Sequence, residues 1–307
     1  GDRHREAEPV RVGMLGADWE VDVAAGRYRL AKIYRVPDFS REVYPPLAGP
    51  GIDAREGDYL LQVNGVEVTV ERSVYAWFQD LAGKQVTLLL NERPSTDGAR
   101  EVTVEPLAGE GRLRYLDWVE RNRRIAAEAS GGRIGYLHLP DTYMGSAVEF
   151  PKYYYAQTRK EGLIVDGRFN GGGLDPDIFL QRLDKPTLSY WTRRYSHDQT
   201  VPHVATRAHL ALLTNYRAGS GGDMLPMEFQ MRNMGPVIGT RTWGGLVGVS
   251  MFLGLIDGGG LTAPDYRIYD NDGRWIVENE GVTPDIEVRL HPAEMARGHD
   301  AQLMKAI

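Results

Sequence analysis

The first third of the chain alternates short apolar runs with turn residues. Each run is rich in β-branched and aromatic residues, and Gly, Pro, Asn or Asp separates it from the next, which is typical of a small β domain. Residues 73–83 (SVYAWFQDLAG) have helical spacing instead. The expected strands are VRVGMLG (10–16), YRLAKIYRV (28–36), DYLLQVNGVEVTV (58–70), KQVTLLLNE (84–92) and REVTVEP (100–106).

A longer amphipathic segment follows at residues 112–130. Its apolar side chains recur at helical intervals with charged residues opposite, and Gly131 and Gly132 end it as a helix C-terminus requires. We expect a helix that links two domains. The apolar positions on its expected buried face are Leu113, Leu116, Val119 and Ile125.

Beyond this helix, apolar runs that resemble buried strands alternate with helical segments, and the chain ends in an amphipathic stretch, AQLMKAI. This order predicts an α/β domain with mostly parallel strands. We therefore expect a β domain over 1–110, a linker helix over 111–132 and an α/β domain over 133–307. The expected strands cover 133–140, 162–169, 209–215 and 236–240, and the expected helices cover 146–160, 175–184 and 221–234.

Composition and charge narrow the possible functions. The net charge is −6 and no basic run could follow a phosphate backbone, so nucleic acid is not expected as a partner. Cys is absent, which removes disulfides and Cys nucleophiles and suggests a reducing, cytoplasmic location. We expect no membrane contact, because no run reaches the ~18 apolar residues of a span. Because the chain opens with Gly1 and stops inside a helix, we interpret it as part of something longer.

Ser220 is the first candidate for chemistry. It follows the apolar run HLALLTN and a turn of small residues, and it stands at the start of an expected helix. Free backbone N–H groups at such a point stabilise a negative atom, as acyl transfer requires. The alternative is an ordinary helix cap, in which Ser220 and Asp223 form a capping box.

A glycine-rich turn is the second candidate. The buried run GLIVDGRF ends in Asn170 and Gly171–Gly173, ahead of a helix start at Asp175 and Pro176. Three glycines let the backbone approach a bound group and direct its N–H groups at an anion or a peptide carbonyl. Any strand-to-helix turn can use glycine, however, and no Lys follows as in a phosphate loop.

Taken together, the two segments resemble peptidase family S41, the tricorn and C-terminal-processing serine peptidases. D-x-R-x-N-G-G-G, the later S-x-x-D, TRTWGGLVG and ENEGVTPDIEV match family segments, and PLAGPGIDAREGDYLLQVNGVEV is similar to its PDZ domains. The resemblance implies a small PDZ-like β domain followed by an α/β catalytic domain of the ClpP/crotonase type. It also implies that GMLGA (13–17) is the carboxylate-binding loop of the PDZ-like domain.

The resemblance separates two branches of the family. The processing branch uses a Ser–Lys dyad, but no Lys occurs between Ser220 and Lys305, which leaves the tricorn branch. That branch implies that Ser220 is the nucleophile, that Gly221 and Gly173 form the oxyanion hole, and that Glu278 helps to hold the base. The contributing glycine among 171–173 is uncertain by one position. Without the family match, Glu278 is a solvated carboxylate at a strand end.

The tricorn base is a His in a Ser-His pair upstream of the PDZ domain, and no Ser-His pair precedes the expected β domain of this chain. His4 lacks the preceding Ser, and His138 lies in a strand, where packing or a hydrogen bond explains it. The remaining histidines have the pattern of loop or surface residues. We expect the base to come from a missing upstream portion, so that residues 1–307 alone hydrolyse peptides slowly or not at all.

The resemblance further implies short peptide or oligopeptide substrates, no metal or organic cofactor, and a homo-oligomeric full-length protein. Asp198 and Asp175 are candidates for attracting basic substrate side chains. A non-catalytic peptide-binding PDZ module is the main alternative, with an inert Ser220. A third possibility is ligand binding by the same α/β architecture, as in retinoid-binding relatives, but fold alone does not define function.

Overall fold

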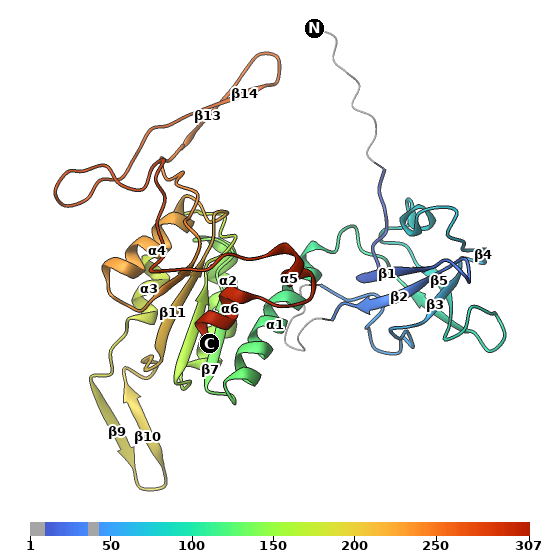
Figure 1. The fold of residues 1–307 in the computed structure, drawn as a ribbon, viewed down its shortest axis with the longest axis horizontal. Helices are drawn as coiled ribbons and strands as arrows, with labels where there is room; N and C mark the ends of the chain where they lie inside the picture. Colours follow the sequence, from blue (N-terminus) through green and yellow to red (C-terminus); the bar gives the residue numbers. More distant parts are fainter. Residues whose placement is uncertain (1–9, 36–42) are drawn as a thin grey trace. The chain divides into compact units, whose positions relative to one another are not determined.

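The computed structural model describes residues 10–35 and 43–307, which form two compact units, Gly1–Arg121 and Asn122–Ile307 (Figure 1). The division falls inside α1 (Gly111–Ala129), the helix expected between the domains. The boundaries at 110 and 132 stay a prediction. Within the described residues, no helix has the length and apolar character needed to cross a membrane.

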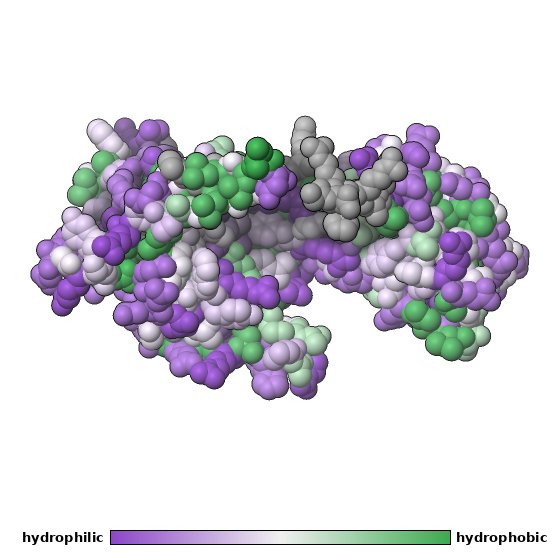
Figure 2. All heavy atoms as spheres, turned by 90° about the horizontal axis from the view of Figure 1, so that it is seen from above, coloured by the Kyte–Doolittle hydropathy of each residue, from purple (hydrophilic) through white to green (hydrophobic). Residues whose placement is uncertain are grey.

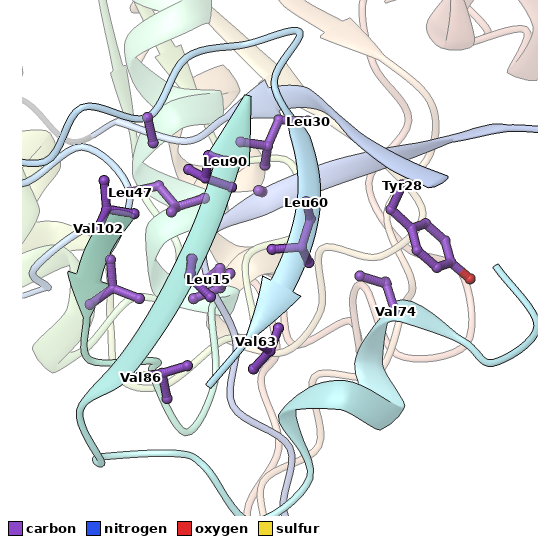
Figure 3. Close-up of a cluster of buried hydrophobic side chains, with 14 of the residues drawn as sticks. Leu15, Tyr28, Leu30, Leu47, Leu60, Val63, Val74, Val86, Leu90 and Val102 are labelled. Atoms are coloured by element: carbon purple, nitrogen blue, oxygen red, sulfur yellow. The ribbon is translucent and has the colours of Figure 1, made fainter. Parts of the chain in front are cut away.

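An antiparallel sheet forms the first unit, in the order β1-β2-β3-β5-β6, with the short β4 (Val66–Glu67) beside β3. Its apolar side chains alternate along the strands and converge on one core, labelled in Figure 3. Leu60, Leu88 and Leu90 are fully buried there, as expected for the inner face of a half-covered sheet. The strands are β1 (Ala17–Asp22), β2 (Arg27–Ile33), β3 (Tyr59–Val63), β5 (Val86–Asn91) and β6 (Arg100–Val104).

Two sequence predictions for this unit are wrong. The run 10–16 makes only isolated bridges at Val12 and Met14, and the first strand begins at Ala17, because Gly16 has φ +68° and turns the chain. The helix expected over 73–83 is a 3₁₀ turn at Val74–Phe78. Its β-branched and aromatic side chains lose rotamer freedom in a helix and favour a short turn.

The second unit contains a sheet of five parallel strands in the order β15-β12-β11-β8-β7, which confirms the α/β prediction. The central strands are buried on both faces, as continuous apolar runs require in a parallel sheet. Helices flank the sheet (Figure 1). The strands are β7 (Ile134–His138), β8 (Gly162–Asp166), β11 (His209–Thr214), β12 (Val237–Gly239) and β15 (Ile286–Glu287).

The expected helices of this unit all form, with shorter bounds. They are α2 (Met144–Tyr154) with the 3₁₀ turn η2 (Tyr155–Gln157), α3 (Asp177–Leu183), α4 (Gly221–Met231) and α6 (Ala301–Ala306), and a short α5 (Pro292–Ala296) precedes the last. The sequence analysis missed two antiparallel hairpins, which extend from the sheet in Figure 1. These are β9 (Ser189–Arg193) with β10 (Ser196–Val201), and β13 (Met251–Gly254) with β14 (Gly260–Ala263).

The outer surface is mixed in polarity. On the face shown in Figure 2, hydrophobic residues lie in separate patches among hydrophilic ones. Several of the exposed apolar side chains belong to the second unit near its glycine-rich turn, among them Tyr143, Leu174 and Trp243. These three become relevant at the candidate site.

Candidate active site

Ser220 lies at the carboxyl edge of the parallel sheet, between β11 and the first turn of α4. Its backbone has φ 57° and ψ −121°, a sparsely populated conformation for a residue with a Cβ. Strain of this kind persists only where the surroundings impose it, and it often marks functional positions. The side chain is half-exposed at the N-terminus of α4, where the helix dipole favours negative charge.

Ser220 is not an ordinary helix cap, so the capping-box alternative is wrong. Its hydroxyl makes no capping hydrogen bond, and its own N–H donates to the Gly245 carbonyl at 3.1 Å. The carboxylate of Asp223 accepts the Gly244 N–H at 2.8 Å instead of the N–H of Ser220. Asp223 therefore fixes the loop beside Ser220 and leaves the Ser220 hydroxyl available.

The glycine-rich turn pairs with Thr142 through an isolated parallel bridge at Gly173. The Thr142 N–H donates to the Gly172 carbonyl at 2.9 Å, and the Leu174 N–H donates to the Thr142 carbonyl at 3.3 Å. Asn170 closes the turn, because its side-chain oxygen accepts the Gly172 N–H at 2.9 Å. Its carbonyl accepts the Gly219 N–H at 3.2 Å, which ties this turn to the Ser220 segment.

The glycines allow the two segments to approach each other closely. A Cβ on Gly172 would lie 2.6 Å from the Cβ of Ser220, and a Cβ on Gly221 would lie 2.7 Å from the Leu174 carbonyl oxygen. Real Cβ atoms do not come this near to other heavy atoms. The absence of side chains at Gly172 and Gly221 is therefore a packing requirement of the site.

Two backbone N–H groups beside Ser220 have no acceptor within the described residues, namely those of Gly173 and Gly221. The N–H of Gly171 is taken by the Pro140 carbonyl and that of Gly172 by Asn170, so Gly173 is the available donor among the three glycines. Paired free N–H groups next to a hydroxyl are the arrangement that stabilises a tetrahedral oxyanion. The roles of Gly173 and Gly221 stay predictions.

Glu278 bonds to the loop that also accepts the N–H of Ser220. Its Oε2 accepts the N–H groups of Leu246 and Val247, both at 2.7 Å, directly after the Gly245 carbonyl that binds the N–H of Ser220. Glu278 is half-buried, and its two bonds hold the loop whose Gly245 carbonyl accepts the Ser220 N–H. No hydrogen bond joins Glu278 to Ser220 itself in the described part of the chain. Its role toward a base stays a prediction.

No His side chain bonds to the Ser220 hydroxyl in the ranges the structure describes. His138 is buried, and its Nε2 donates to the Arg168 carbonyl at 2.8 Å. Burial lowers the pKa of His138 from its ordinary value, because the charged ring loses its hydration. His138 is thus a packed strand residue, as expected, whereas His4 lies outside the described residues.

The sequence analysis overlooked Thr142 and Trp243. The buried Thr142 hydroxyl has no partner within the described residues, and it would lie 2.0 Å from a Cβ on Gly221. The Trp243 ring packs over Gly219 and Gly245, yet 63% of the residue is exposed. The TRTWGGLVG segment could have indicated Trp243. Thr142 has no sequence signal, because its position depends on the bridge between the segment after β7 and the glycine turn.

The described residues contain no group of three or more His, Asp or Glu side chains that could hold a metal ion. Asp198 lines a cavity of about 520 Å³ with His197 and Arg207, and Ser220 does not line it. Asp175 instead follows the glycine turn and accepts the Asp177 N–H at 2.8 Å. The structure brings Ser220, Gly173, Gly221 and Asp175 into one region and leaves Asp198 at another cavity.

The second unit, with Ser220 at a strained turn on a parallel α/β sheet, has the architecture of a serine peptidase. Residues 133–288 match the model of peptidase family S41, and the chain belongs to this family. Residues 13–109 match the tricorn protease PDZ domain. The resemblance to the tricorn branch predicted from the sequence is thereby confirmed, together with the order of the two domain types.

Similar proteins extend over nearly the whole chain. The tricorn protease of Thermoplasma acidophilum is 34% identical over 309 residues, and tricorn protease homolog 1 of Streptomyces coelicolor is 35% identical over 298. These matches cover 100% and 97% of this chain but 28% of each relative. A crystal structure of the tricorn protease superposes with a TM-score of 0.89 at 34% identity, covering 96% of this chain and 28% of that one.

Proposed function

We propose that this chain is the catalytic portion of a tricorn-type serine peptidase that hydrolyses short peptides through an acyl-enzyme on Ser220. The supporting observation is a pair of N–H groups, on Gly173 and Gly221, that have no acceptor among the described residues and lie beside Ser220, whose backbone is strained. Family membership supports serine peptidase chemistry, and the site geometry supports these residues as its carriers.

The chemistry assigns each group a task. Ser220 Oγ attacks the peptide carbonyl carbon while a base removes the hydroxyl proton, and the carbonyl oxygen becomes negative. The N–H groups of Gly173 and Gly221 donate to that oxygen, and the leaving amine takes the proton from the base. Water then attacks the ester carbonyl while the base takes its proton, and that proton passes to Ser220 Oγ as the C–O bond breaks and the acid product leaves. One preorganised N–H donor of this kind contributes about 10²–10³ in rate.

The general base in this proposal is a His supplied from outside residues 1–307, positioned with the help of Glu278. The packed state of His138 and the absence of a His bonded to Ser220 in the described residues support this idea. The length of the relatives, of which this chain matches 28%, provides room for such a residue elsewhere. We further propose that the full-length protein is a cytoplasmic homo-oligomer and that its peptide hydrolysis needs no cofactor.

Labelling with a fluorophosphonate, which reacts with activated serines, tests this function. We expect slow labelling of residues 1–307, a clear increase when imidazole is added as an external base, and loss of both in Ser220→Ala. Ser189→Ala is the matched control, because Ser189 is an exposed serine of β9 in the same unit.

Each outcome decides between the alternatives. Fast labelling without imidazole would place the base inside this chain and overturn the external His. Labelling that survives Ser220→Ala would reject Ser220 as the nucleophile. No labelling of Ser220 under either condition would favour the non-catalytic peptide-binding module, for which the PDZ match is the supporting observation.

A further inference from the structure

The carboxylate-binding loop predicted at Gly13–Ala17 leads directly into β1. Within the described residues, β1 is an edge strand that pairs only with β2. PDZ domains hold a peptide by adding it as a strand to such an edge, while loop N–H groups receive its terminal carboxylate. The first unit therefore has the elements of a peptide-binding groove in the expected places.

This loop already holds a carboxylate of the same chain. The N–H of Gly16 donates to Oε2 of Glu110 at 2.9 Å, in buried surroundings. Two further loop donors are also used internally, since the Gly13 N–H bonds to the Phe78 carbonyl and the Met14 N–H to the Leu107 carbonyl, both at 2.8 Å. The Glu110 side chain thus takes the position at Gly16 that a peptide carboxylate would need.

Arg114 anchors Glu110 in this position. Its Nε donates to Glu110 Oε1 at 2.7 Å, while its Nη1 donates to Asp18 Oδ1 at 2.8 Å. A guanidinium that binds two carboxylates at once restricts both of them, because its donors lie in a rigid plane. Glu110 is only 8% exposed, so this charge-assisted contact is poorly screened by solvent.

The first turn of α1 covers the loop above this contact. Leu113 is fully buried, and its Cδ2 would lie 2.4 Å from a Cβ on Gly16. Gly16 has φ +68°, so both its conformation and its contact with Leu113 require glycine. The five consecutive residues 110–114 therefore supply a carboxylate, its cation and an apolar cover.

We propose that Glu110 is a built-in ligand of the PDZ-like loop, and that this unit accepts a peptide carboxyl terminus only when Glu110 withdraws. A tethered carboxylate competes at a high effective concentration, which a free peptide must exceed. The apparent affinity for peptide equals the affinity of the open loop multiplied by the fraction of time that the loop is open. The contact is an autoinhibitory latch within one compact unit, and it does not depend on the chemistry of Ser220.

Fluorescence anisotropy with a labelled peptide tests the latch on the full 1–307 chain. The peptide ends in an apolar residue and is compared as free carboxylate and as C-terminal amide. We expect the parent chain to bind both forms equally weakly, and Glu110→Ala to bind the free carboxylate about tenfold more tightly than the amide. Glu101→Gln, at an exposed position of β6, is the control and should behave as the parent.

The proposal is overturned if the parent prefers the free carboxylate as strongly as Glu110→Ala does, or if the variant shows no preference. Glu110→Ser shortens the side chain, takes the acceptor away from the Gly16 N–H, and serves if the alanine variant does not fold. The NMR resonance of the Gly16 amide gives a second measurement, with acetate as the probe. We expect acetate to shift it in Glu110→Ala or Glu110→Ser and to leave it unchanged in the parent; equal responses would reject the latch.

Discussion

Gly172 shows how much one residue can determine at this site. It has φ +81°, and an added Cβ would collide with the Cβ of Ser220 at 2.6 Å. Its neighbour Gly171 has an ordinary backbone conformation, and a Cβ there would meet only the Pro140 carbonyl oxygen, at 3.9 Å. The same substitution at these two positions therefore separates site geometry from general stability.

We predict that Gly172→Ala reduces imidazole-supported labelling of Ser220 about a hundredfold, because a displacement of the order of 1 Å at a reacting centre has that effect. Gly171→Ala should label at nearly the parental rate. Time courses of fluorophosphonate labelling measure both, with circular dichroism to establish folding. Equal losses in the two variants would contradict a close contact between the glycine turn and Ser220.

Glu228 on α4 provides a pH-dependent contribution to stability. Burial, followed by the negative charge of Asp175, raises its pKa from 4.5 to about 7. Asp177 also raises this pKa and Arg232 lowers it. Since the folded pKa exceeds the unfolded one, this contribution is fully present below the unfolded pKa and is lost as the pH rises through the folded pKa.

We predict that the free energy of unfolding of the parent falls by about 1 kcal/mol between pH 4.5 and 7, a value reduced for solvent screening. Glu228→Gln should remove this part of the pH dependence. Urea unfolding across that range measures it, and Glu287→Gln, at an exposed carboxylate, is the control. An unchanged pH profile in Glu228→Gln would contradict the raised pKa.

At the scale of elements, a buried ion pair connects the central sheet to the C-terminal helix. Arg168, just beyond β8, bonds to Asp166 at 2.7 Å and to Asp300 at 2.8 Å. Asp300 is also the cap of α6, since its carboxylate accepts the Leu303 N–H at 3.0 Å. Arg168 is 1% exposed, so its removal would leave two carboxylates in or near the core without their cation.

Arg168→Met should destabilise the second unit by about 3–5 kcal/mol, the range for breaking a buried pair. Arg289→Met removes an exposed partner of Glu287 and should cost less than about 1 kcal/mol. Denaturant unfolding gives both values, and hydrogen exchange at α6 reports whether the helix loosens first. A small effect at Arg168 would show that the two aspartates do not depend on it.

On the scale of the whole molecule, the chain combines two units that each carry a candidate site. Within the described residues, the first carries an edge strand and a loop whose Gly16 N–H binds Glu110, and the second carries the strained Ser220 beside two N–H groups without an acceptor. The chain spans 28% of the length of the two tricorn relatives described above. We propose that the general base comes from outside residues 1–307, because no His side chain in the described residues bonds to Ser220.

Much of this architecture follows from local sequence. The alternation of apolar runs predicts β2, β3, β5 and β6, and the continuous apolar runs predict the parallel strands of the second unit. The predicted buried face of α1 is confirmed at Leu113, Leu116 and Val119. At the following turn Asn122 is buried, whereas the predicted Ile125 is half-buried, and the Asn122 side chain bonds to Tyr136. A polar residue satisfied by a distant partner has no signature in a hydrophobic pattern.

The sequence by itself determined the two domain types, the family and the identity of the candidate nucleophile, because these depend on periodicity and on motifs of neighbouring residues. Only the tertiary structure decided that the Ser220 side chain makes no capping bond, that the Gly173 N–H has no acceptor among the described residues, and that Glu110 accepts the Gly16 N–H of the PDZ-like loop. Each of these depends on a hydrogen bond, or its absence, between segments that are far apart in the chain. Such contacts are determined by packing between distant segments, and a local residue pattern contains no information about them.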